Sequence, residues 1–118
     1  MLFTNVIKKN KEFVLAYRRG KRCVNSAVCV YYYKNKTPYN ALGITAGKKL
    51  GNAVERNRAK RIIRAAYRLS EKEIPLGYNI VIVAREGIAF KKSSDLERFF
   101  KTRLVSQMRK DENRQGKS

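Results

Sequence analysis

The segment from Lys48 to Arg68 constrains this chain most, because it combines a complete helix pattern with a concentrated positive charge. Asn52 is placed to cap a helix, and Glu55 follows three residues later, where its carboxylate can accept a hydrogen bond from the cap amide. Apolar residues then recur with helical spacing at Ala59, Ile62, Ile63, Ala66 and Tyr67. The pattern predicts an amphipathic α-helix that buries one stripe of side chains.

The rest of that helix surface is almost entirely basic. Glu55 is its one acid, against eight basic side chains: Lys48, Lys49, Arg56, Arg58, Lys60, Arg61, Arg64 and Arg68. Positive charges four residues apart repel one another and destabilise an isolated helix. A polyanion would relieve this repulsion, and the planar guanidinium of arginine suits bidentate contacts with phosphate. We therefore predict a nucleic-acid-binding face, with a merely solubilising face as the alternative.

The overall charge points to the same kind of partner. The chain has 28 basic and 9 acidic residues, a net charge of +19, which makes nucleic acid the first candidate partner and a membrane surface the second. It has no apolar run of about 18 residues and no signal-peptide pattern, so we expect a cytoplasmic protein. Its 118 residues predict one domain over residues 1–109 and a flexible polar tail over 110–118.

Side chains that could carry catalysis are scarce. The chain has no histidine, its acids form no pair suited to a metal or to acid–base chemistry, and it lacks a glycine-rich phosphate loop. Cys23 and Cys29 do not form a zinc pattern; if both lie on one strand, their even spacing places them on the same face as small core residues. We predict no catalytic residue, no metal site and no cofactor held by the protein alone.

Alternation and turn residues predict the order α-β-β-α-β-α, an α+β class domain with a mixed sheet packed by helices. Helices are expected over 8–20, 52–68 and 94–108, and strands over 22–33, 39–46 and 78–84, with the first strand open to division by a turn. The last strand is apolar on both faces and should be central. Residues 39–84 would join parallel strands through a helix, for which base rates favour a right-handed crossover.

Two groups of aromatic residues could bind single-stranded RNA. Phe13 and Tyr17 share one face of the first helix, and Tyr31, Tyr32 and Tyr33 must alternate between the two faces of a strand. At least one tyrosine therefore offers its ring to solvent or to a ligand, as a stacking platform for bases. Packing in the core explains both groups equally well.

Residues 47–61, GKKLGNAVERNRAKR, resemble the characteristic basic motif of the bacterial ribonuclease P protein subunit. The motif is long and position-specific, and its centre is the RNR triplet at 56–58. The segments NKEF at 10–13 and YNIVIVAR at 78–85 fit the same family. The similarity covers nearly the whole chain.

This resemblance implies a subunit that helps a catalytic RNA remove the 5′ leader from precursor tRNA, lowering the requirement for Mg²⁺ that is held mainly by RNA. The leader would lie in a cleft containing Phe13, Tyr17 and Tyr31. A shift in the alignment with the family would put Tyr32 or Tyr33 in the place of Tyr31. The catalytic RNA would contact the set Lys48, Lys49, Asn52, Arg56, Asn57, Arg58, Lys60, Arg61, Arg64 and Arg68.

The resemblance also changes the expected topology and the expected partners. It implies a left-handed crossover in place of the right-handed one, in a fold similar to a domain of a small-subunit ribosomal protein. It implies no membrane contact and no obligatory protein partner. Two other functions stay open from the residues alone: a ribosomal or general RNA-binding protein, and a stand-alone nuclease, which the lack of histidine and of a carboxylate cluster disfavours.

Overall fold

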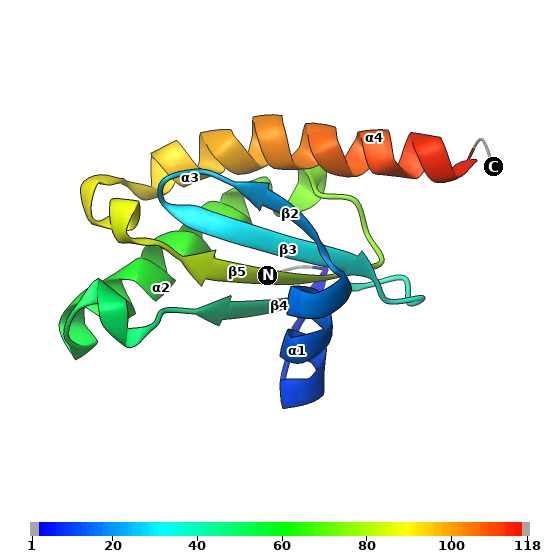
Figure 1. Cartoon of the computed structure of the whole chain (residues 1–118). Helices are drawn as coiled ribbons and strands as arrows, with labels where there is room; N and C mark the ends of the chain where they lie inside the picture. The colour runs from blue at the N-terminus through cyan, green and yellow to red at the C-terminus, as the bar shows by residue number, and fades with distance from the viewer. Residues whose placement is uncertain (1–2, 117–118) are drawn as a thin grey trace.

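A five-stranded mixed sheet forms the centre of the structure, a computed structural model that describes residues 3–116 (Figure 1). The strands lie in the order β1-β4-β5-β3-β2. Their bounds are β1 Thr4–Val6, β2 Lys21–Val24, β3 Val28–Lys34, β4 Asn40–Thr45 and β5 Tyr78–Ala84. The helices are α1 Asn10–Arg19, α2 Ala53–Ser70, α3 Ser93–Phe99 and α4 Val105–Gly116, with short helical turns η1 Lys48–Leu50, η2 Glu71–Glu73, η3 Glu86–Phe90 and η4 Phe100–Leu104.

Strand β5 occupies the middle of the sheet, as its apolar sequence predicts. It pairs in parallel with β4 and antiparallel with β3, and Ile80, Val81 and Ile82 are fully buried although they point to alternating faces. Helix α2 joins the parallel neighbours β4 and β5, so the predicted strand–helix–strand unit is present. The α+β class and the mixed sheet packed by helices are confirmed.

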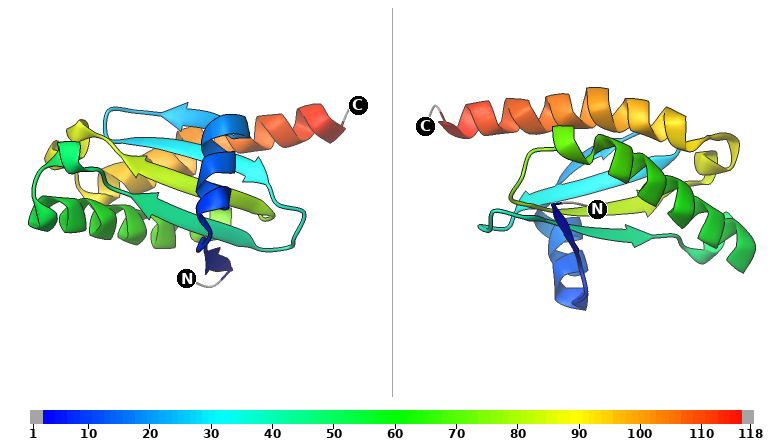
Figure 2. Two further views of the ribbon diagram at one scale, coloured as in Figure 1. Left: turned by 60° about the horizontal axis from the view of Figure 1, so that its bottom comes forward. Right: turned by 180° about the vertical axis from the view of Figure 1, so that it is seen from behind.

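The helices cover the two faces of the sheet unequally (Figure 2). Helices α2, α3 and α4 pack on one face over the main core, which contains Ile63, Tyr67 and Phe100 among many others. Helix α1 crosses the other face alone, over a small cluster centred on Ile7, Ala16 and Val81. A large part of that second face is therefore left uncovered by helices.

The segment 22–33 is a hairpin rather than one long strand. The side chain of Asn25 accepts hydrogen bonds from the backbone amides of Ala27 and Val28, each at 2.8 Å, and this turn separates β2 from β3. Cys23 consequently pairs with Val30 and lies in the main core, whereas Cys29 points to the face that carries α1. The expectation that the two cysteines share a face, which assumed one continuous strand, is wrong because the turn breaks the alternation.

Strand β1 has no counterpart among the predicted elements. It spans three residues, too few to show a period, and it pairs in parallel with β4. The buried carboxylate of Glu71 holds its start, accepting hydrogen bonds from the amide of Phe3 at 2.9 Å and from the hydroxyl of Thr4 at 2.6 Å. Contacts across nearly 70 positions of sequence therefore fix this edge of the sheet.

The last helix extends beyond the point where the sequence suggested a flexible tail from residue 110. Helix α4 continues to Gly116, and residues 117 and 118 lie outside the described residues. Asp111 accepts a hydrogen bond from the hydroxyl of Tyr32, and Glu112 accepts one from Tyr78 at 3.1 Å. These two contacts explain the extension, because they fasten a polar helix end to the sheet.

Buried tyrosines should make the fold sensitive to alkali. Burial raises the pKa of Tyr67 from 10.0 to about 12 and also raises the pKa of Tyr32 and Tyr78. A raised folded-state pKa gives stability that is complete below pH 10 and lost as the pH rises towards 12. We expect the free energy of unfolding, measured with denaturant between pH 9 and 11, to begin falling near pH 10, and Tyr67→Phe to flatten that fall. A wild-type profile that stays level would contradict this.

Candidate nucleic-acid interface

Helix α2 presents one exposed row made of Asn57, Arg61, Arg64 and Arg68. The sequence creates the row by placing Ala59, Ile63, Ala66 and Tyr67 on the opposite side, where all four are buried against the sheet. We call this set of four exposed residues the arginine row. Within the described residues, none of its three arginines forms an ion pair, so their charge remains available to a partner.

The start of α2 is built as predicted. The Asn52 side chain accepts a hydrogen bond from the Glu55 amide at 3.0 Å, and the Glu55 carboxylate accepts one from the Asn52 amide at 3.3 Å. Gly51 has a φ of 125°, and a Cβ there would lie 2.5 Å from the Glu55 carboxylate. Glycine is thus needed to bring η1, with exposed Lys48 and Lys49, against the first turn of α2.

Not every basic residue of α2 points outwards. Arg58 donates through its two terminal nitrogens to the carbonyl oxygens of Ile88 at 3.5 Å and Lys91 at 3.2 Å, which connects α2 to the turn η3. Arg56 and Lys60 are half-buried, and the Nε of Arg56 is buried without a hydrogen-bond partner in the described part of the chain. The predicted RNA-binding set therefore divides into the outward row and residues that also support the fold.

The two roles should separate on substitution. We expect Arg58→Ala to lower the free energy of unfolding by about 1–3 kcal/mol, because two backbone carbonyls lose a charged donor. Arg61→Ala, in the exposed row, should change stability by less than about 0.5 kcal/mol. Denaturant titration of the two variants measures the difference, and equal stabilities would show that the Arg58 contacts contribute nothing.

On the opposite face of the sheet, α1 and β3 bring the predicted cleft aromatics together. The rings of Tyr17 and Tyr31 meet edge to face, with centroids 5.1 Å apart and an interplanar angle of 79°. Phe13 lies directly over Gly43 of β4, where an added Cβ would come within 2.6 Å of the ring. Tyr17 is exposed and Tyr31 half-buried, so part of this aromatic surface is open. We call Phe13, Tyr17 and Tyr31 the aromatic groove, after the cavity that Phe13 lines at one end of this surface.

The three consecutive tyrosines have different surroundings. Tyr32 points away from α1 into the main core. Tyr33 points towards α1, but its hydroxyl accepts a hydrogen bond from Asn79 at 2.7 Å and donates one to the Glu12 carbonyl at 3.3 Å. Tyr31 is therefore the tyrosine that reaches Tyr17.

The arginine row and the aromatic groove meet at one edge of the sheet. A cavity of about 160 Å³ is lined by Arg64 from α2 and by Phe13 from α1, with Gly43 and Ile44 of β4 between them. A larger hollow of about 470 Å³ lies beside α1 and has Lys34, Lys36 and Tyr39 in its lining. The arginine row and the aromatic groove are therefore adjoining surfaces. Sequence spacing alone did not reveal that they lie close together.

The described residues contain neither a metal-binding cluster nor a membrane-spanning helix. No group of three or more histidine, cysteine, aspartate or glutamate side chains is arranged to hold a metal ion within them. No helix in residues 3–116 is long and apolar enough to cross a membrane.

A small α+β domain with a basic helical row and a neighbouring aromatic groove has the features of an RNA-binding protein. The family model described as Ribonuclease P matches residues 1–108. The chain therefore belongs to the ribonuclease P protein family, as its motif suggested.

Sequence relatives and solved structures agree with this assignment. The chain is 44% identical over 94 residues to the ribonuclease P protein component of Clostridium botulinum strain Loch Maree, covering 79% of this chain and 85% of the relative. It resembles the Staphylococcus aureus RNase P protein structure with a TM-score of 0.73 and 33% identity, over 89% and 94% of the two chains. The Thermotoga maritima protein gives a TM-score of 0.65 and 29% identity, over 88% and 91%.

Proposed function

We propose that this chain binds the catalytic RNA of ribonuclease P through α2 and binds the 5′ leader of precursor tRNA through the aromatic groove. The chemistry of cleavage belongs to the RNA, and Mg²⁺ is held mainly by RNA. The observation that carries the proposal is the adjoining placement of the arginine row and the aromatic groove, which share the cavity between Arg64 and Phe13. A chain that held only one RNA by charge would have no use for the second surface.

The arginine row suits the phosphates of a folded RNA. Its side chains are exposed, project from a rigid helix and belong to a protein with net charge +19. Arginine binds phosphate through a planar fork of donors, and each phosphate it neutralises releases a bound counterion from the RNA. Lys48 and Lys49 extend the same charge past the start of the helix.

The aromatic groove suits an unpaired strand. Bases of single-stranded RNA stack on aromatic rings with little sequence preference, which a subunit that meets many different leaders requires. Arg64 at the border of the groove would contact the leader backbone or the catalytic RNA where the two come close. The positive charge of the protein would screen crowded phosphates there and so reduce the Mg²⁺ needed for cleavage.

The identity of the bound RNA tests this proposal against general RNA binding. The tagged protein is purified from cells at low salt, and the RNA that accompanies it is sequenced. Enrichment of ribonuclease P RNA together with precursor tRNA supports the proposal. Enrichment of ribosomal RNA alone, or equal recovery of all abundant RNAs, would favour the general RNA-binding alternative.

A further inference from the structure

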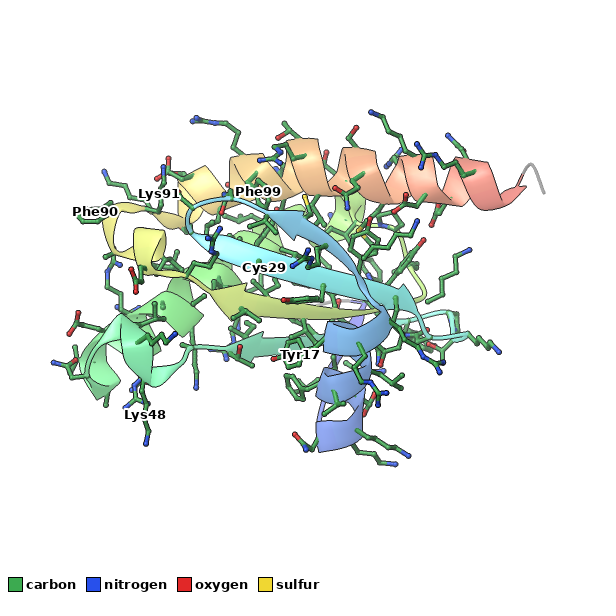
Figure 3. All side chains as sticks on the ribbon, viewed as in Figure 1. Tyr17, Cys29, Lys48, Phe90, Lys91 and Phe99 are labelled. Atoms are coloured by element: carbon green, nitrogen blue, oxygen red, sulfur yellow. The ribbon has the colours of Figure 1, made fainter. Side chains whose placement is uncertain are left out.

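Phe90 has a position that the two surfaces described above do not explain. Its side chain is 88% exposed, the highest value among the exposed large apolar side chains of the described residues. It ends the turn η3, which follows the central strand β5. Figure 3 shows Phe90 and Lys91 at the upper left of the view, well above Lys48 and far from Tyr17 on α1.

The turn that carries Phe90 is held firmly. Ile88 is buried in the main core, and the Lys91 amide donates to the Ile88 carbonyl at 3.1 Å. Arg58 donates to the carbonyls of Ile88 and Lys91, one on each side of Phe90 in the chain. The Gly87 amide donates to Ser26 at 3.1 Å, and a Cβ at Gly87 would clash with that carbonyl. The exposed ring therefore sits on a braced support, which lowers the entropy lost on binding.

The surroundings of Phe90 are basic. Lys91 and Lys92 follow it directly in the chain, and the guanidinium of Arg58 lies against the same turn. Glu86 in the turn and Glu55 at the start of α2 add two negative charges on the side of the turn that faces α2. An exposed aromatic ring amid positive charge matches a nucleic-acid base attached to a phosphate backbone, because the ring takes the base and the cations take the phosphates.

We propose that Phe90 stacks on an unpaired base of the catalytic RNA that α2 binds. The turn is fastened to α2 by Arg58, on the sheet face opposite α1, so the catalytic RNA is the partner within reach rather than the leader. The base must be unpaired, since bases inside an RNA duplex are already stacked on each other. This inference rests on the proposed function, and it adds an apolar contact to an interface otherwise made of charges.

Affinity for purified ribonuclease P RNA, measured at several salt concentrations, gives the first test. Loss of one stacked base should weaken binding of Phe90→Ala between about fivefold and a hundredfold. The slope of log affinity against log salt should stay unchanged, because no phosphate contact is lost. Lys91→Ala, the matched control, should reduce that slope by about one unit. An unchanged affinity of Phe90→Ala, or a reduced slope, overturns the inference.

Fluorescence gives a second and more local test, because the chain contains no tryptophan. Phe90→Trp keeps a stacking ring, so it should bind with wild-type affinity, and its fluorescence should be quenched by ribonuclease P RNA but not by a fully paired RNA hairpin. Leu76 precedes the other end of β5 and is 52% exposed. The fluorescence of Leu76→Trp should respond to neither RNA. Equal quenching at both positions, or quenching by precursor tRNA alone, contradicts the assignment.

Two further outcomes separate failure of this inference from failure of the proposed function. If the wild-type protein itself does not prefer ribonuclease P RNA over ribosomal RNA, the proposed function fails and the inference fails with it. If the preference is intact while Phe90→Ala binds like wild type, the inference alone fails. Sedimentation without RNA would also overturn it if wild type is a dimer and Phe90→Ala a monomer, since the ring would then contact a second copy of the chain.

Discussion

Replacing Arg61, Arg64 and Arg68 together by alanine is expected to weaken binding of ribonuclease P RNA about a hundredfold at about 0.15 M salt. Each arginine neutralises one phosphate in the proposed interface, and each such contact contributes about fivefold at that salt concentration. The slope of log affinity against log salt, expected near −4 to −5 for about six neutralised phosphates, should fall in magnitude by two to three units. Filter binding across a salt series measures both quantities.

The matched control changes three basic residues of another helix. Arg109, Lys110 and Arg114 lie exposed on α4, and their replacement by alanine removes the same net charge. This control should lose much less affinity, because only the long-range field of the protein changes. Neither triple variant removes a buried side chain, so both should unfold at temperatures close to wild type. Equal losses of affinity in the two variants would show that charge alone, without a defined face, binds the RNA.

The second large effect is expected in the aromatic groove. Tyr31→Ala and Phe13→Ala should each weaken binding of precursor tRNA to the reconstituted holoenzyme by about tenfold or more, because a stacked base contributes roughly 1–3 kcal/mol. Binding of mature tRNA, which has no leader, should be nearly unchanged. The ratio of the two affinities is the quantity to measure, since it cancels any general loss of RNA binding.

Three further variants accompany this prediction. Val14 lies on α1 and is 41% exposed, so Val14→Ala should leave the ratio at its wild-type value. Phe13 covers Gly43, so Phe13→Ala could also loosen α1, whereas Tyr17→Ala removes an exposed ring and should lower the ratio without that complication. Arg61→Ala should reduce assembly with the catalytic RNA and leave the ratio alone. If the tyrosine and arginine variants fail in the same way, the two surfaces do not have separate roles.

The sequence predicted local features well, because local spacing determines them. The capping box of Asn52 and Glu55, the buried stripe of α2 and the central position of β5 all appear in the structure. The alternation of Tyr31, Tyr32 and Tyr33 was also correct, and the structure selects Tyr31 as the partner of Tyr17. Each of these depends on residues close together in the chain.

Features that depend on distant contacts were missed. The hydrogen bonds of Asp111 and Glu112 to tyrosines about 80 and 34 positions earlier in the chain extend α4 past the expected tail. The Glu71 carboxylate fixes β1, which is too short to predict from sequence. Arg58, one of the residues predicted to contact the catalytic RNA, also donates to the carbonyls of Ile88 and Lys91, because only the folded chain brings those carbonyls to it. The meeting of Arg64 and Phe13 at one cavity has the same origin.

The Mg²⁺ requirement of cleavage tests the proposed function most directly. Ribonuclease P RNA and precursor tRNA are combined over a range of Mg²⁺ concentrations, with and without the protein, and the protein alone serves as the control for nuclease activity of its own. We expect the protein to lower the Mg²⁺ concentration that gives half-maximal cleavage while the cut stays at the same nucleotide. An Mg²⁺ requirement that is the same with and without the protein would contradict the account.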